Sequence, residues 1–313
     1  MKIKLCVAWM VLGLGGFFTS CKNEGSGQAS SGLSRLSSEV PRIEVCFVLD
    51  TTGSMSGLIE GAKDKIWSIA GEILEAHPGA KVRMGLIGYR DRGDAYVTKR
   101  FGLTDDLDAL YAELLQYQAD GGGDTPESVN QALAEAVDLM DWTGSGKVLR
   151  MIFLVGDAPP QMSYQDDIKY PVSCQKAVER GILINTVQCG NLEGTDVVWQ
   201  KIASLTDGRY VALGQTGDMV VREAPQDKRL EELNRQAGAT LLPYGSRRQR
   251  AEVLNKQSVS ESAPAARIAD RLGYNSKSGK AVQGRGDLLD DMKDGVVKLD
   301  ELKKRIYRRP GGA

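Results

Sequence analysis

Histidine is nearly absent from this chain. Its 313 residues include a single histidine, His77, beside 41 acidic and 40 basic side chains. One histidine excludes zinc and iron sites that need several imidazole ligands. It also argues against Ser-His-Asp and Cys-His catalytic units, because one imidazole would have to serve the whole reaction. His77 lies at a predicted helix end, where a structural role is the simpler interpretation.

Aromatic residues and net charge are also scarce. Aromatic side chains make up 6% of the chain and the formal net charge is −1, so the chain carries no nucleic-acid signature. The near-zero sum conceals two unlike parts: residues 22–220 hold 18 basic and 28 acidic side chains, and residues 221–313 hold 20 basic and 13 acidic ones. The sequence therefore predicts an acidic part of net charge −10, a basic part of net charge +7 and no nucleic-acid partner.

The first 20 residues have the pattern of a targeting segment rather than of a folded element. Lys2 and Lys4 form a short basic start, and 14 apolar residues follow from Leu5 to Phe18. This run is shorter than the roughly 20 residues that a membrane-spanning helix needs. With Cys21 close behind, the segment resembles a bacterial lipoprotein signal peptide over residues 1–20, which implies that Cys21 is acylated and anchors the chain to a membrane. Ordinary signal cleavage nearby, with Cys21 incidental, is the alternative.

Residues 21–40 form a linker by composition. Between Lys22 and Val40 the chain holds six serines and three glycines in 19 residues, which is typical of a flexible tether with a reach of about 25 Å. The lipoprotein resemblance implies that this linker attaches the protein to a membrane of the bacterial cell envelope, either in the periplasm or at the cell surface.

Short apolar runs alternate with amphipathic segments through the acidic part of the chain. The runs predict strands, which are expected at residues 42–49, 82–89, 96–103, 148–155, 182–188 and 210–213. The amphipathic segments predict helices, which are expected at residues 58–73, 107–117, 129–140, 172–180 and 197–205. This alternation predicts an α/β fold: a doubly wound, mostly parallel six-stranded sheet with one antiparallel edge strand and helices on both faces.

The basic part of the chain is poorer in large apolar residues. Its pattern predicts a helix over 227–236, a strand over 239–243, and helices near 265–272 and 296–307. Segments rich in Gly, Ser and Lys separate them. We therefore expect residues 239–313 to form a helical extension that either docks on the first domain or is partly disordered.

Three loops rich in hydroxyl and carboxyl groups lie beside predicted strand or helix ends. Their sequences are Asp50-Thr51-Thr52-Gly53-Ser54, Gly123-Asp124-Thr125-Pro126-Glu127 and Gly156-Asp157-Ala158. This set resembles a von Willebrand factor type A domain with a metal-ion-dependent adhesion site, which uses Asp-x-Ser-x-Ser, a Thr and an Asp on three successive loops. The matching residues here are Asp50, Thr52, Ser54, Thr125 and Asp157. Thr52 replaces the middle Ser and keeps its hydroxyl.

The resemblance implies a binding function and no catalysis. The domain would occupy residues 41–238, and the five oxygen-bearing side chains would coordinate Mg²⁺, or Mn²⁺ or Ca²⁺ in its place. Carboxylate and hydroxyl oxygens are hard donors that suit these ions better than zinc. In this family an open position on the ion accepts a Glu or Asp carboxylate of a partner protein. The resemblance also allows a subunit or scaffold role in an envelope complex.

Each residue also has a structural interpretation, and the first loop has a rival chemical one. Asp50 could cap the following helix, and Thr125 before Pro126 could be a helix N-cap. The first loop also resembles the Asp-Lys-Thr-Gly-Thr motif of haloacid-dehalogenase-like phosphotransferases, in which Asp50 would be the nucleophile. Thr51 then replaces the motif's Lys, and Gln161 stands where an acidic residue is expected.

The three cysteines after the linker are expected near the sheet. Cys46 lies in the first predicted strand and has the character of a small core residue. Cys174 begins a predicted helix, and Cys189 ends the strand that follows it. A disulfide between Cys174 and Cys189 is compatible with an exported protein, although one sequence does not determine connectivity.

Overall fold

A six-stranded sheet forms the centre of the protein. The computed structural model describes residues 40–123, 125–215 and 225–298. The strand order is β3-β2-β1-β4-β5-β6, and only the β2–β3 pair is antiparallel. The strands are β1 (Arg42–Asp50), β2 (Lys81–Tyr89), β3 (Thr98–Thr104), β4 (Val148–Gly156), β5 (Ile182–Cys189) and β6 (Tyr210–Leu213). The predicted sheet and its antiparallel edge strand are confirmed.

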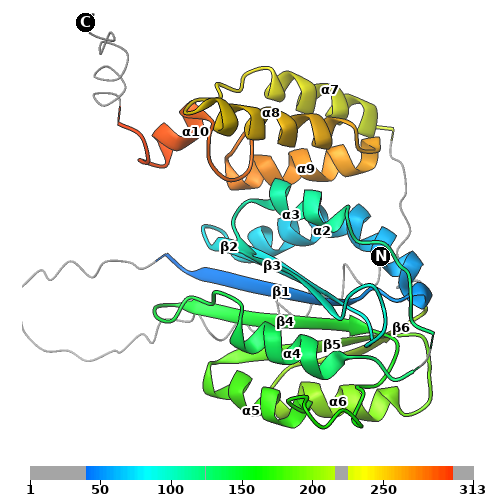
Figure 1. The fold of residues 1–313 in the computed structure, drawn as a ribbon. Helices are drawn as coiled ribbons and strands as arrows, with labels where there is room; N and C mark the ends of the chain where they lie inside the picture. Colours follow the sequence, from blue (N-terminus) through cyan, green and yellow to red (C-terminus); the bar gives the residue numbers. More distant parts are fainter. Residues whose placement is uncertain (1–39, 124, 216–224, 299–313) are drawn as a thin grey trace, which may run out of the picture.

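Helices cover both faces of the sheet. One face carries α2 (Ser56–Ala76) and α3 (Leu107–Leu114). The other carries α4 (Val129–Asp138), α5 (Tyr170–Glu179) and α6 (Thr195–Leu205), as Figure 1 shows. Alternate residues of β1 enter the two cores, with Phe47 on the α2 side and Val48 on the α4 side. Because both faces are buried, the central strands are almost uniformly apolar.

The register of the central strands brings two acidic residues to one edge. β1 and β4 are parallel neighbours with Leu49 opposite Val155, so Asp50 and Asp157 both emerge at the carboxyl edge of the sheet. Gly156 lies between them. A Cβ atom on Gly156 would lie 2.3 Å from the Tyr89 hydroxyl oxygen and 3.2 Å from Asp50 Oδ2, so a larger residue would clash there.

The C-terminal part of the chain is helical and packs on one face of the domain. Its helices are α7 (Asp227–Gly238), α8 (Arg247–Glu261), α9 (Ala265–Ser278) and α10 (Leu288–Lys293). In Figure 1 this group lies over α2 and α3. α9 packs along α2, α8 packs against α3, and α7 packs against α9. The described part of the extension therefore docks on the α2 and α3 side of the sheet.

Two predictions for the extension need correction. Residues 239–243 do not form a strand: they are a turn after α7 whose β character is one isolated bridge between Pro243 and Asp287. The helices α8 and α10 were not predicted. The helix expected at 296–307 lies mostly outside the described residues, and no helix is present at 296–298.

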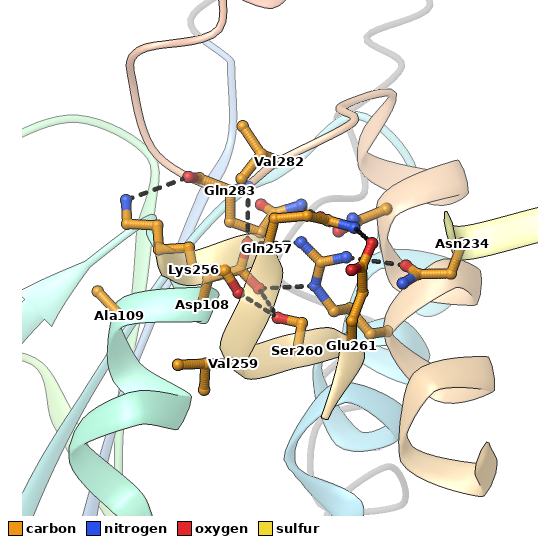
Figure 2. Close-up of polar contacts among 12 residues, drawn as sticks. Asp108, Ala109, Asn234, Lys256, Gln257, Val259, Ser260, Glu261, Val282 and Gln283 are labelled. Carbon is orange, nitrogen blue, oxygen red and sulfur yellow. Dashed lines mark hydrogen bonds and ion pairs between the residues drawn. The ribbon is translucent and has the colours of Figure 1, made fainter. Parts of the chain in front are cut away.

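A buried ion pair joins the extension to the domain. The Arg271 guanidinium on α9 donates two hydrogen bonds to Asp108 on α3, at 2.8 and 2.9 Å, and a third of 2.8 Å to Asn234 on α7. The backbone N–H of Gln283 also donates to Asp108, at 3.1 Å. Figure 2 shows Asp108, Asn234 and Gln283 converging on this point from separate elements. A buried ion pair is stable only when both charged groups have hydrogen-bond partners, and these contacts supply partners for both Arg271 and Asp108.

The structure does not contain the disulfide considered for Cys174 and Cys189. Both residues are free, buried thiols. Cys189 faces the core beneath α2, whereas Cys174 on α5 packs in the core on the opposite face. The sheet therefore separates the two sulfur atoms, although their segments are neighbours in the chain. Among the described helices, none is long and apolar enough to cross a membrane.

Candidate functional site

The first loop turns immediately after the buried end of β1. Asp50 Oδ1 accepts hydrogen bonds from the Thr52 backbone N–H at 2.9 Å and from the Thr52 hydroxyl at 2.6 Å. The hydroxyl oxygens of Thr52 and Ser54 are 3.3 Å apart. Asp50 and Thr52 are buried, whereas Ser54 is exposed. The loop therefore gathers one carboxylate and two hydroxyls at the start of α2, as the sequence predicted.

The third loop adds Asp157 to this group. Asp157 is partly exposed, and its negative charge contributes to the raised pKa of Asp50, which places the two carboxylates in one electrostatic environment. The Gln215 side-chain amide donates to Asp157 Oδ2 at 2.6 Å and to the Ser54 carbonyl at 3.3 Å. Gln215 thus bridges the first and third loops.

The second loop is tied to both of the others through its backbone. Gly53 N–H donates to the Gly121 carbonyl at 3.2 Å. Glu127 N–H donates to the Pro159 carbonyl at 3.1 Å, and Gln161 N–H donates to the Glu127 carbonyl at 2.7 Å. These bonds fix the three loops at one edge of the sheet.

Thr125 differs from the other four predicted residues in its contacts. Its side chain is exposed and makes no hydrogen bond with any described residue. The interpretation of Thr125 as a helix cap is wrong, since α4 begins at Val129 with Ser128 in the N-cap position. Polar contacts therefore connect Asp50, Thr52, Ser54 and Asp157, and Thr125 is exposed in the second loop.

Glu127 is the residue of the second loop that turns inward. It is 2% exposed, and its Oε2 atom is buried without a hydrogen-bond partner. A Cβ atom added to Gly122 would lie 2.7 Å from Thr52 Cβ and 3.5 Å from Glu127 Oε1. The Thr52 and Glu127 side chains therefore both lie next to Gly122. The motif that predicts the site includes Glu127 in its second loop but gives this residue no role. The one sequence feature that could have identified Glu127 is its position in a loop already assigned to the site.

Three buried oxygen atoms at this edge lack a hydrogen-bond partner within the described structure: Asp50 Oδ2, Glu127 Oε2 and the Tyr89 hydroxyl. Burial raises the pKa of Asp50 to about 7, and the charge of Asp157 adds to this effect. Burial also raises the pKa of Glu127 to about 8, with Asp50 the largest of the acidic neighbours that contribute. The pKa of Tyr89 is raised well above its usual value, mainly by burial. The site thus brings several acidic groups together, and none of its own residues supplies a compensating positive charge.

The donor atoms fit a hard divalent cation. The candidate ligands are all oxygens, and an unpartnered buried carboxylate oxygen is the group that a cation would satisfy. The described residues contain no cluster of three or more His, Cys, Asp or Glu side chains arranged to hold a metal. Coordination here would therefore depend on the Thr52 and Ser54 hydroxyls as well as on carboxylates.

Two curated proteins have sequences similar to parts of this chain. An ariadne-like RING finger protein of Acanthamoeba polyphaga mimivirus is 21% identical over 245 residues, which are 72% of this chain and 24% of that protein. The rat von Willebrand factor A domain-containing protein 7 is 37% identical over 106 residues, 34% of this chain and 11% of that protein. This chain therefore spans at most about a quarter of the length of these relatives.

A solved structure and a family profile complete the comparison. The proximal thread matrix protein 1 of the mussel byssus aligns with a TM-score of 0.43 and 14% identity, over 56% of this chain and 42% of that one. The profile of the von Willebrand factor A domain matches residues 44–213, from β1 to the end of β6. Because this match covers more than half of the 313 residues, the chain belongs to the von Willebrand factor A domain family.

Proposed function

We propose that the domain binds a divalent cation through Asp50, Thr52, Ser54 and Asp157, and through the cation an acidic side chain of a partner protein. The observation that carries this proposal is the buried Asp50 carboxylate, whose Oδ2 atom has no hydrogen-bond partner. Domains of this family are generally interaction modules rather than enzymes. Mg²⁺ is the expected ion, with Mn²⁺ or Ca²⁺ as substitutes of the same ligand preference.

The surroundings of the site favour an anionic partner group on the ion. α2 begins directly after the first loop, at Ser56, and the N-terminus of a helix attracts negative charge. Thr125 is exposed in the second loop, and its hydroxyl is the fifth ligand that the family resemblance implies. Glu127 supplies a further carboxylate from the interior side of the second loop.

The phosphotransferase alternative receives less support. The motif of that class has a lysine next to the nucleophile, and this chain has Thr51 there. The Thr51 hydroxyl instead donates to the Tyr89 carbonyl at 2.9 Å and lies 2.7 Å from the Tyr96 hydroxyl. Thr51 therefore connects the first loop to its neighbours and leaves no cationic group at this position.

The envelope location belongs to the same proposal. We infer from the sequence of residues 1–20 that Cys21 is lipidated and that residues 21–40 tether the domain to a bacterial envelope membrane. These residues lie outside the described part of the structure. Metabolic labelling with a radioactive fatty acid should mark the wild-type chain and leave Cys21→Ala unlabelled. Label retained by Cys21→Ala would exclude this anchor.

Metal titration tests the site. Because a ligand that binds only the folded state stabilises it, millimolar Mg²⁺ or Mn²⁺ should raise the melting temperature of the EDTA-treated protein by several degrees. Asp50→Ala should remove this shift. Asp141→Ala is the matched control, since Asp141 is an exposed carboxylate that pairs with Arg83 away from the site. An equal shift in wild type and Asp50→Ala would contradict the proposed site.

Affinity capture tests the partner. The wild-type chain, Asp50→Ala and Asp141→Ala are each used as bait with envelope extract, in Mg²⁺ and in EDTA. We expect a protein that wild type and Asp141→Ala retain in Mg²⁺ and that both EDTA and Asp50→Ala release. Blocking the carboxyl groups of the extract with a carbodiimide and an amine should abolish its retention. Retention unaffected by EDTA would exclude metal-bridged binding.

A further inference from the structure

A cavity of about 650 Å³ with a mixed polar and apolar lining lies at the amino-terminal edge of the sheet, opposite the candidate metal site. Its walls come from the starts of β1 and β2 and from the segment between the end of α9 and α10. In Figure 1 these ends lie on the same side of the molecule. The volume falls within the range of small-molecule sites. The docking of the C-terminal helices therefore creates a cavity that neither part encloses alone.

Most of the charged side chains in the lining are basic. Six basic residues face two acidic ones, Asp105 and Asp294. The basic residues are Arg42, Lys81, Arg83, Lys277, Lys280 and Arg285. Four of the six have carboxylate partners at 2.8 to 3.4 Å, namely Arg83, Lys277, Lys280 and Arg285. Arg42 and Lys81 form no ion pair with any described residue. The uncompensated positive charge of the cavity thus lies on two residues.

The backbone holds these two cations next to each other. Arg42 and Lys81 are register partners at the starts of the neighbouring parallel strands β1 and β2. Adjacent strands are separated by about 4.8 Å, so two like charges at paired positions repel each other. Their backbone N–H groups are already used, Arg42 by the Lys147 carbonyl and Lys81 by the Pro41 carbonyl. A multivalent anion between the two side chains would remove this repulsion.

The rest of the lining could accommodate an organic group attached to that anion. Leu74, Pro78, Val82 and Tyr274 provide apolar surface, and Ser278 and Gln283 provide polar groups. Asp105 offsets part of the positive charge and disfavours a ligand that is anionic at every point. The lining therefore suits a molecule with one anionic head and an uncharged body.

We propose that this cavity binds a phosphate-bearing ligand, with Arg42 and Lys81 contacting the phosphate oxygens. Guanidinium and ammonium groups form strong charge-assisted hydrogen bonds with phosphate. A soluble phosphate ester and the headgroup of an anionic phospholipid share this chemistry, whereas the choline cation neutralises the phosphate of phosphatidylcholine. The site is separate from the candidate metal centre and does not depend on its function.

Calorimetric titration in EDTA tests the proposal without involving the metal centre. The full chain is titrated with inorganic pyrophosphate, with vesicles of phosphatidylglycerol and with vesicles of phosphatidylcholine. We expect saturable binding of at least one of the first two probes, and none to phosphatidylcholine. The double variant Arg42→Gln/Lys81→Gln should weaken it about tenfold or more, since two charge-assisted contacts are lost. Lys81→Arg should bind within about threefold of wild type, because it keeps the charge.

Lys147→Gln is the matched control. Lys147 is an exposed cation beside β1 at the same edge, and it does not line the cavity. Unchanged binding by Lys147→Gln, with unchanged melting curves for all variants, would support the cavity as the site. Equal weakening by Lys147→Gln would overturn the proposal in favour of general attraction to this edge. Absence of saturable binding to both pyrophosphate and phosphatidylglycerol would also overturn it. Binding of one alone identifies the source of the phosphate.

Discussion

At the residue scale, Asp50 combines burial with incomplete pairing. Thr52 satisfies Oδ1 twice, and Oδ2 has no partner. A buried charged oxygen without a partner destabilises the fold. We therefore predict that Asp50→Asn in EDTA at pH 8 has a free energy of unfolding about 1–3 kcal/mol above that of wild type, while losing its response to Mg²⁺. Urea denaturation with and without the ion measures both effects.

The exposed residue Asp141 again provides the control for this measurement. Asp141→Asn should change the free energy of unfolding by no more than about 0.5 kcal/mol, as is usual for surface positions. If Asp50→Asn has a lower free energy of unfolding than wild type in EDTA, the Asp50 carboxylate stabilises the fold and this prediction is wrong.

The cysteines allow a second prediction at this scale. Cys46, Cys174 and Cys189 are buried free thiols, and burial raises the pKa of Cys174 to about 12. A thiol needs exposure and its thiolate form to react. A thiol reagent should therefore leave Cys174 and Cys189 unmodified in the native protein and label both after denaturation without reductant. Peptide mapping distinguishes the sites. A Cys174–Cys189 peptide in unreduced digests would contradict the structure.

The sequence could predict only part of the site, and the reason lies in side-chain direction. Asp50 and Asp157 were predictable because parallel strands bring their carboxyl ends to one edge. Thr125 and Glu127 share a loop, and the loop's path decides which of them turns inward. That path depends on backbone bonds to Gly121 and Pro159, which join segments far apart in the chain. A motif of residue types does not contain this information.

At the element scale, the strength of the apolar pattern decided which elements could be predicted. The six strands were identifiable because burial on both faces makes them continuously apolar or strongly alternating. α8 was missed because few of its residues are apolar; of its 15 residues, only Val253, Gln257 and Ser260 are buried. Its N-terminus has a capping box formed by Ser246 and Gln249, which is a sequence signal that the apolar pattern did not support.

The ion pair between α3 and α9 provides a prediction at this scale. Arg271→Met would leave the Asp108 carboxylate buried beside Ser260 and Gln283 without its cation. We expect the free energy of unfolding to fall by about 3–5 kcal/mol, as is typical when one partner of a buried pair is removed. Chemical denaturation of wild type and variant measures the difference.

An exposed pair on α8 is the matched control. Arg248 and Glu252 are four residues apart and 2.9 Å from each other on an exposed face. Arg248→Met should cost no more than about 0.5 kcal/mol. Similar losses for Arg248→Met and Arg271→Met would show that burial of the α3–α9 pair has no special importance.

At the scale of the whole molecule, the domain and the described C-terminal helices form a continuous structure. Trp67 on α2 and Tyr111 on α3 are 1% and 2% exposed. The ring of Trp67 lies 6.0 Å from that of Tyr274 on α9. Large aromatic side chains of the domain therefore depend partly on the extension for their burial.

Truncation tests this dependence. A chain ending at Gln215 should expose Trp67 and Tyr111 and lose several kcal/mol of apolar burial. Its melting temperature should fall by about 10 °C or more, and it should bind the dye ANS. Calorimetry of the full chain should show a single transition. Two well-separated transitions, or a truncated chain as stable as the full one, would show that the parts fold independently.

The hydrogen bonds of Gln215 have a consequence for how the parts communicate. This residue is the last one described before the connection to the C-terminal helices, and its amide bonds both Asp157 and the Ser54 carbonyl. A cation bound by Asp157 Oδ2 would share that oxygen with the Gln215 amide, because a carboxylate oxygen can accept a hydrogen bond and bind a cation. One oxygen at the carboxyl edge of the sheet would then contact both the cation and the segment that leads to the C-terminal helices. Binding at this edge is therefore expected to affect the position of the chain after β6.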